Sequence, residues 1–189
     1  EKLSSGLRIN RAADDAAGLS ISEKMRGQIR GLEQSQRNVQ DGISFAQTAE
    51  GAMNEVSSML VRMKELSVQQ ANGTYSTGDK SNIKAELGQL GAQIDSILSN
   101  TNFNNIKITS SISIQADDNA FKITVKGIST AGFKGLTSGV SLGSTTSAIT
   151  AVAKQRANLG AVQNRLEYTS NNLGTTIENL TASESRIRD

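Results

Sequence analysis

A long, regularly spaced row of apolar residues is the feature that most constrains the fold of this chain. From residue 16 to residue 71 the row advances by steps of three and four residues, which places one apolar stripe along a helix. Because an α-helix rises 1.5 Å per residue, some 55 residues would extend about 80 Å, far beyond a globular helix. The pattern predicts a coiled-coil rod. The row comprises Met25, Ile29, Leu32, Gln36, Val39, Ile43, Ala46, Glu50, Met53, Val56, Leu60 and Met63.

A second long helix is predicted over residues 147–189. Its main row repeats every seven residues: Val152, Leu159, Leu166, Leu173, Leu180 and Ile187. The companion row is mostly small or polar: Ala148, Gln155, Val162, Thr169, Thr176 and Ser183. One strong row beside one weak row favours packing within a multi-helix bundle over a symmetric dimeric zipper.

The segment between these helices changes pattern twice. Residues 72–78 are expected to form a turn, because they are rich in glycine and polar residues. A shorter helix is predicted to follow over 79–98, with the apolar row Ile83, Leu87, Leu90, Ile94 and Ile97. Residues 106–146 begin with alternating apolar and polar residues, which predicts a β-hairpin followed by a loop. With a polar loop over residues 1–15, the fold class is mainly α with a small β element. We expect a single elongated, multi-helix coiled-coil rod domain over residues 1–189.

The composition excludes most reactive sites. The 189 residues contain no cysteine, histidine, proline or tryptophan. Disulfides, zinc ribbons, iron–sulfur clusters, histidine metal sites and Ser-His-Asp triads are therefore excluded. We expect no catalytic residues, no cofactor and no metal.

Charge and hydropathy argue against two further classes of partner. The net charge is only +2, and acidic and basic residues are interspersed, so no basic stripe follows a nucleic-acid backbone. No apolar run approaches the 18 or so residues of a membrane span. The opening residues 1–5 do not have the charged and then apolar pattern of a signal peptide, so we expect no cleavable leader in this sequence. Because the helical pattern still runs at Asp189, we expect a fragment trimmed at both ends.

Two clusters of acidic residues can be interpreted either as structural elements or as functional sites. Asp14 and Asp15 could be paired catalytic carboxylates, but adjacent helical side chains diverge, so capping of the long helix is favoured. Asp117, Asp118 and Asn119 could suggest calcium, but their spacing fits a hairpin turn better. The helical glycines Gly27, Gly31, Gly42 and Gly51 are expected to let a neighbouring helix approach closely.

A series of blocks then resembles one family. Residues 3–19, which read LSSGLRINRAADDAAGL, resemble the N-terminal signature of bacterial flagellin. Residues 41–44, 47–52, 64–69 and 101–104 follow in the family's order, and residues 159–167 and 183–189 resemble its C-terminal helix. No single block would be specific, but the ordered series is.

The resemblance implies a non-enzymatic structural subunit of the extracellular bacterial flagellar filament, which supports motility. Its partners would be other flagellin subunits and the host Toll-like receptor for flagellin. The resemblance also implies a D1 core fragment without the terminal D0 helices that drive polymerisation, and hence a monomer. The alternatives are a hook–filament junction protein or another secreted coiled-coil structural protein, a signalling coiled coil and, more distantly, a hydrolase.

The resemblance also carries over a receptor-binding surface. It falls on Arg62, Leu66, Gln69, Ile83 and Glu86. The helical spacing of Arg62, Leu66 and Gln69 suggests a stripe more than a quarter turn from the apolar row, with Leu66 as an exposed centre. An ordinary solvated face, or a contact with a neighbouring subunit, is the alternative. The chain departs from the family's common pattern at Val61, where glutamine is frequent, and at Lys64, where arginine is frequent.

Overall fold

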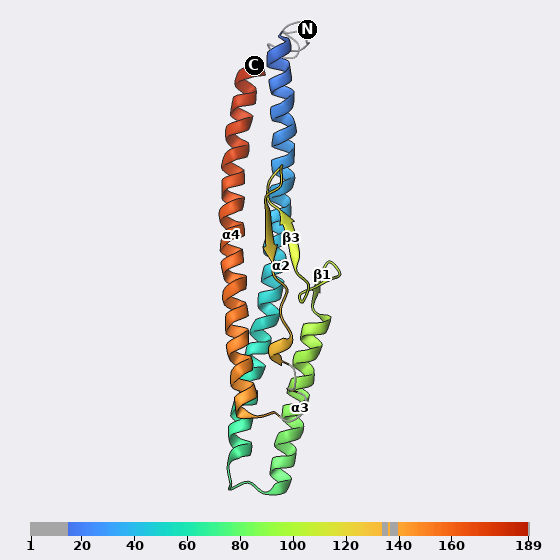
Figure 1. The fold of residues 1–189 in the computed structure, drawn as a ribbon, viewed down its shortest axis with the longest axis vertical. Coiled ribbons are helices and arrows are strands. Elements are labelled where there is room, and N and C mark those ends of the chain that lie inside the picture. Colours follow the sequence, from blue (N-terminus) through green and yellow to red (C-terminus); the bar gives the residue numbers. More distant parts are fainter. Residues whose placement is uncertain (1–14, 134–135, 137–139, 189) are drawn as a thin grey trace. The chain divides into compact units, whose positions relative to one another are not determined.

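The structure is a computed structural model that describes residues 15–133, 136 and 140–188. It consists mainly of long helices with small β-hairpins, which confirms the predicted fold class (Figure 1). The element order is α2 (Ala16–Ala71), α3 (Thr77–Asn100), β1 (Asn102–Phe103), β2 (Ile106–Lys107), β3 (Ile112–Gln115), β4 (Lys122–Val125), a 3-10 turn η1 (Ala131–Phe133) and α4 (Leu142–Arg188).

The chain packs as two compact units, and both long helices contribute to each. The first unit comprises Glu1–Ile43, Ser113–Thr124 and Asn164–Asp189, and the second comprises Ser44–Ile112 and Val125–Gln163. The first unit thus holds the start of α2, the β3–β4 hairpin and the end of α4. That residues 1–189 act as one rod domain stays a prediction.

The second unit buries the central part of the apolar row of α2. Met53, Val56, Leu60 and Met63 are fully buried, as the spacing predicted. After a short turn α3 runs back along α2 (Figure 1). The buried face of α3 follows Ile83, Leu87, Gly91, Ile94 and Leu98, whereas the predicted row used Leu90 and Ile97, which are only partly buried. The first half of α4 adds buried Ala148, Val152 and Leu159.

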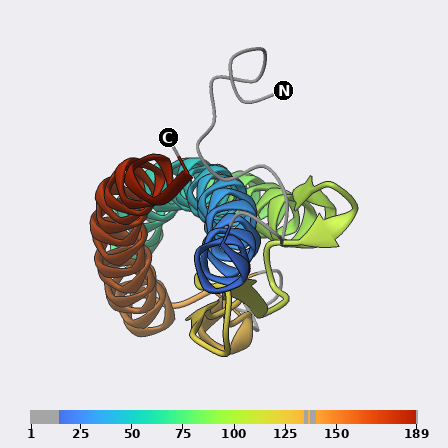
Figure 2. The same cartoon turned by 90° about the horizontal axis from the view of Figure 1, so that it is seen from above.

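The first unit packs the start of α2, the end of α4 and the β3–β4 hairpin around a smaller core. Its buried apolar residues are Leu32, Val39, Ile114, Ala116, Ile123, Leu166 and Leu173. The hairpin lies against α2 in both views (Figures 1 and 2). Near the end of α4 the Glu184 carboxylate accepts a hydrogen bond from the Ser22 hydroxyl at 2.9 Å and forms an ion pair with Arg26, whose Nε atom lies 2.9 Å away.

Helix α4 begins at Leu142 and not at residue 147. The Ser141 hydroxyl accepts a hydrogen bond from the backbone N–H of Ser144, and the Ser141 carbonyl accepts one from that of Thr145. This is an N-cap, which the sequence pattern hid inside a segment rich in Gly, Ser and Thr that is typical of a loop. Helix α3 likewise begins at Thr77, ahead of the predicted residue 79, because Ser76 caps it.

The β-region contains two hairpins rather than one. Strands β3 and β4 form the predicted hairpin, and a side-chain hydrogen bond joins Ser113 to Thr124 at 3.2 Å. Strands β1 and β2 form a second, very short hairpin with Phe103 opposite Ile106. Its turn residues Asn104 and Asn105 both have positive φ, as a two-residue hairpin turn of type I′ requires.

The helical glycines only partly meet the expectation of close approach. Gly31 faces the Asp118 side chain and Gly42 faces Ile114, so the nearest neighbour of each is the β3–β4 hairpin. A helix also approaches Gly42, because a Leu166 methyl group of α4 lies 3.5 Å from the position that a Cβ atom would take there. A methyl group added at Gly27 or Gly51 would meet no atom within 4 Å. Close packing therefore accounts for two of these glycines, and nothing in the structure explains the other two.

The pair Gly42 and Gly51 yields a matched test of this packing. In Gly42→Ala the new methyl group would overlap the end of the buried Ile114 side chain and lie 3.1 Å from its Cγ1 atom. We expect this overpacking to lower the free energy of unfolding by about 1–3 kcal/mol. Gly51→Ala should raise it by up to about 1 kcal/mol, because alanine is the better helix former. Urea unfolding of both variants measures the difference, and equal shifts of the same sign would contradict the packing.

Candidate functional site

Arg62 forms the centre of an exposed charged surface between α2 and α3. Its guanidinium group donates two hydrogen bonds to Glu86 of α3, at 3.1 and 3.0 Å, and one to Glu65 at 3.3 Å. The hydrogen bond to Glu86, followed by that to Glu65, raises the pKa of Arg62. All three side chains are roughly half exposed, so the pairs orient the guanidinium group more than they stabilise the fold.

The structure overturns the expectation that Leu66 is an exposed centre. Leu66 is only 2% exposed, and Ile83 of α3 is 8% exposed. The physical reason lies in the helical geometry, since Leu66 is three residues after the buried Met63 and residues three apart share a face. Helix α3 runs alongside this part of α2, as the Arg62–Glu86 bonds show, and widens the buried face. Leu66 and Ile83 therefore belong to the core beneath the charged surface.

Gln69 is half-buried and fixed at the turn between α2 and α3. Its side-chain amide donates a hydrogen bond to the Tyr75 hydroxyl at 3.0 Å. The five carried-over residues thus lie together across α2 and α3 but differ in accessibility. Arg62 and Glu86 are accessible, Gln69 is partly so, and Leu66 and Ile83 are not.

The start of α3 is held by a reciprocal cap. The Ser76 hydroxyl accepts from the backbone N–H of Asp79, while the Asp79 carboxylate accepts from the Ser76 hydroxyl and backbone N–H. The hydroxyl bond, and then the backbone bond, lower the pKa of Asp79. The cap is accordingly complete above the usual aspartate range and is lost as the pH falls through this lowered pKa.

The two acidic pairs of the sequence behave as structural elements where they are described. The Asp15 carboxylate accepts a hydrogen bond from the backbone N–H of Gly18 at 2.9 Å, directly before α2, so it caps the helix as predicted. Asp14 lies outside the described residues. In the β3–β4 turn the Gln115 side chain donates to the carbonyls of Asp117 and Asn119, each at 2.9 Å, which confirms the turn.

The carboxyl groups of Asp117 and Asp118 lie close together in this turn. The hydrogen bond with Asp117, then slight desolvation and the Asp117 charge, raise the pKa of Asp118. Among the described residues there is no group of three or more Asp, Glu, His or Cys side chains placed to hold a metal ion. Among the same residues, no helix is both long and apolar enough to cross a membrane.

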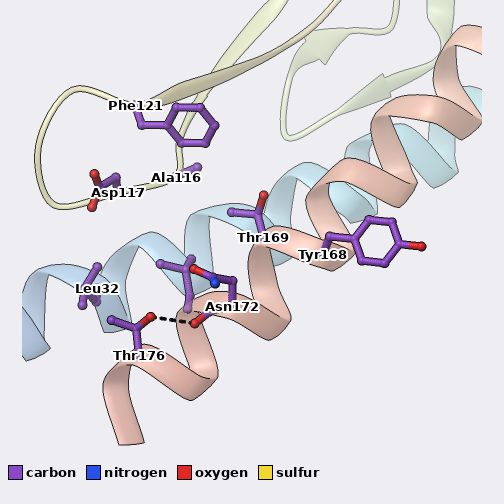
Figure 3. A pocket seen from close by; sticks show the side chains of 9 residues that line it. Leu32, Ala116, Asp117, Phe121, Tyr168, Thr169, Asn172 and Thr176 are labelled. Atoms are coloured by element: carbon purple, nitrogen blue, oxygen red, sulfur yellow. Dashed lines mark hydrogen bonds between the residues drawn. The ribbon is translucent and has the colours of Figure 1, made fainter. Parts of the chain in front are cut away.

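The first unit also contains an open groove that the sequence did not predict. It lies between α2, α4 and the β3–β4 hairpin, and its volume is about 370 Å³ (Figure 3). The residues that line it are Leu32, Ala116, Asp117, Phe121, Tyr168, Thr169, Asn172, Leu173 and Thr176. They come from three segments far apart in the chain, so no local pattern indicates the groove. The sequence signal that could have pointed to it is the isolated aromatic Tyr168 on a polar position of α4.

Long helices that bury regular apolar rows against one another, and carry ion pairs on their outer faces, define a helical structural protein. The comparisons with known proteins agree. Residues 1–113 match the model of the bacterial flagellin N-terminal helical region, and residues 142–189 match that of the C-terminal helical region. The chain belongs to the bacterial flagellin family. It is a non-enzymatic structural subunit of the extracellular flagellar filament.

Individual relatives align over the whole chain. A flagellin of Halalkalibacterium halodurans is 48% identical, with 100% of this chain and 76% of the relative covered. A flagellin of Bacillus subtilis is 43% identical, with 100% and 78% covered. The crystal structure of Bacillus cereus flagellin superimposes with a TM-score of 0.66 at 31% identity, over 72% of this chain and 88% of that one. These matches do not support the expectation that the terminal D0 helices are missing.

The burial of Leu66 can be tested directly by mutation. Leu66→Ala removes a buried side chain and should lower the free energy of unfolding by about 2–5 kcal/mol. Val68→Ala, on an exposed position of the same helix, should change it by no more than about 0.5 kcal/mol. Urea unfolding followed by circular dichroism measures both. If Leu66→Ala proved as stable as Val68→Ala, the burial of Leu66 would be contradicted.

Proposed function

We propose that these 189 residues are the D1-like core of the flagellin subunit, and that polymerisation of the complete subunit depends on its terminal D0 segments. The resemblance to the family assigns polymerisation to those segments. The observation that carries the core role is the full burial of Met53, Val56, Leu60 and Met63 of α2 in the second unit. The relatives' greater length, of which this chain covers 76–78% in the examples above, is consistent with further segments.

The 189-residue chain alone should therefore sediment as a monomer or a weakly associating species. Its described outer surface is mostly polar, with only scattered large apolar side chains exposed. Sedimentation velocity and electron microscopy at increasing protein concentration measure this. Filaments that grow from the 189-residue chain without added subunits would contradict the proposal.

We also propose recognition by the host Toll-like receptor for flagellin, at the Arg62 surface described above. The support is the resemblance of residues 64–69 and their neighbours to the family, together with the exposure of Arg62 and Glu86. Arginine is among the residue types that dominate binding energies at protein interfaces. Gln69 would contribute from the edge, while Leu66 and Ile83 would act by holding α2 and α3 in position.

This second proposal makes Arg62 its decisive residue. Arg62→Ala should weaken receptor binding about tenfold, because it removes a charged, oriented donor group, and should leave the helix content unchanged. Arg37→Ala is the matched control, since Arg37 is an exposed α2 arginine of the first unit whose guanidinium group donates hydrogen bonds to Gln34. Surface plasmon resonance against the receptor ectodomain compares them. Equal affinities for both variants would overturn the proposal.

At Val61 and Lys64 the chain differs from the family's common pattern, which allows a variant with higher receptor affinity to be predicted. Both residues are exposed beside Arg62. Lysine cannot reproduce the planar, bidentate donor geometry of arginine. Lys64→Arg should therefore bind the receptor more tightly than the unchanged chain, in the same assay.

A further inference from the structure

The turn that joins α2 to α3 contains the one Asn-Gly pair of the chain, Asn72-Gly73 (Figure 1). We propose that this pair is a site of spontaneous covalent modification, at which Asn72 deamidates through a cyclic succinimide and becomes aspartate or isoaspartate. Water is the only co-reactant. The reaction therefore needs no enzyme and proceeds in the extracellular filament as well as in the isolated chain.

The pair lies in an exposed part of the turn. Asn72 directly follows the last residue of α2, and Asn72, Gly73 and Thr74 are all exposed. Among the described residues no group accepts a hydrogen bond from the Gly73 N–H or from the amide nitrogen of the Asn72 side chain. The two nitrogen atoms that the reaction uses are thus unengaged, the first as the nucleophile and the second as the leaving group.

The side-chain carbonyl of Asn72 is polarised for attack. Its Oδ1 atom accepts a hydrogen bond from the backbone N–H of Thr74 at 3.2 Å. Negative charge develops on this oxygen when a nucleophile adds to the carbonyl carbon, and a preplaced N–H donor stabilises such charge. The same bond directs the Asn72 side chain toward the main chain that follows it, which begins with the Gly73 nitrogen.

Nothing in the described fold requires glycine at position 73. The φ angle of Gly73 lies outside the left-handed region, and a methyl group added there would meet no atom within 4 Å. Glycine does provide an unhindered nitrogen and flexible φ and ψ angles, which let that nitrogen approach the Asn72 side chain. The Asp41-Gly42 pair could form the same ring, but it lies inside α2, where helical hydrogen bonds hold the backbone.

The reaction balances without an oxidant or a cofactor. The Gly73 nitrogen loses its proton to solvent and bonds to the Cγ atom of Asn72. The Cγ–Nδ2 bond then breaks, and the nitrogen takes up a proton from solvent and leaves as ammonia. Water adds to one of the two carbonyl carbons of the ring. Cleavage at Cγ gives aspartate and cleavage at the main-chain carbonyl gives isoaspartate, so either product replaces a neutral amide by a carboxylate.

Isoaspartate changes the turn itself. The main chain then runs through the former side chain and gains a methylene group, and the Oδ1 acceptor of the Thr74 bond becomes part of the main chain. The 3.0 Å bond from the Gln69 amide to the Tyr75 hydroxyl spans the modified residue. The new carboxylate also lies directly after the C-terminal end of α2, where the helix dipole disfavours negative charge. The modification therefore loosens the connection between α2 and α3.

Peptide mapping by mass spectrometry tests the proposal on the folded 189-residue chain. The chain is incubated for several weeks in mildly alkaline buffer made with water that contains heavy oxygen. We expect the peptide that carries Asn72 to take up the label and to separate into aspartate and isoaspartate forms. The rate should lie within about threefold of that of a synthetic peptide of residues 69–76, because exposed loops open at little cost. An intact Asn72 in the folded chain, while the synthetic peptide reacts, would refute the proposal.

Gly73→Ala tests the succinimide route separately from direct hydrolysis. Because the added methyl group displaces no atom, the circular dichroism spectrum and the melting temperature should not change. The conversion of Asn72 should slow about tenfold, since the methyl group hinders the nitrogen and restricts the backbone. Gly78→Ala, a substitution in α3 that does not follow an asparagine, is the matched control and should leave the rate unchanged. Equal rates in Gly73→Ala and Gly78→Ala would rule out attack by the Gly73 nitrogen.

Discussion

Burial of the apolar row of α2 is the interaction on which the rest of the structure depends. In the second unit Met53, Val56, Leu60 and Met63 lose all contact with solvent, against rows supplied by α3 and α4. Each buried side chain of this size contributes roughly 1.5–3 kcal/mol relative to an exposed one. Isolated helices are marginal in water, so the 56 residues of α2 owe their stability to this packing and not to local propensity.

The same packing determines which residues remain for recognition. Leu66 and Ile83 are both buried in the core. The sequence analysis expected Leu66 to be exposed, whereas it counted Ile83 both in the apolar row of residues 79–98 and in the receptor-binding surface. The side chains that remain accessible on the α2–α3 face are charged and polar, and they lie around Arg62 and Glu86. In the first unit the aromatic side chains of Phe121 and Tyr168 remain accessible. A filament subunit needs such differing faces because repeated contacts between unlike surfaces extend an assembly.

The errors of the sequence analysis have identifiable physical causes. Leu66 was misplaced because its angle was judged against the whole row, although its nearest row member, Met63, is only three residues away. The start of α4 was misplaced because Ser141, Ser144 and Thr145 favour both loops and helix caps, and the spacing of apolar residues does not distinguish them. The close neighbour of Gly42 proved to be Ile114 of the hairpin, a residue 72 positions away.

The sequence by itself determined the long helices, their apolar faces, the β3–β4 hairpin and the family, because periodicity and ordered motifs are properties of the chain alone. Only the tertiary structure decided what covers each face. It placed α3 over Leu66, the hairpin over Gly31 and Gly42, and it assembled the groove from residues near positions 32, 117 and 168. Helical spacing specifies the direction in which a side chain points, whereas the element it meets depends on contacts between distant segments.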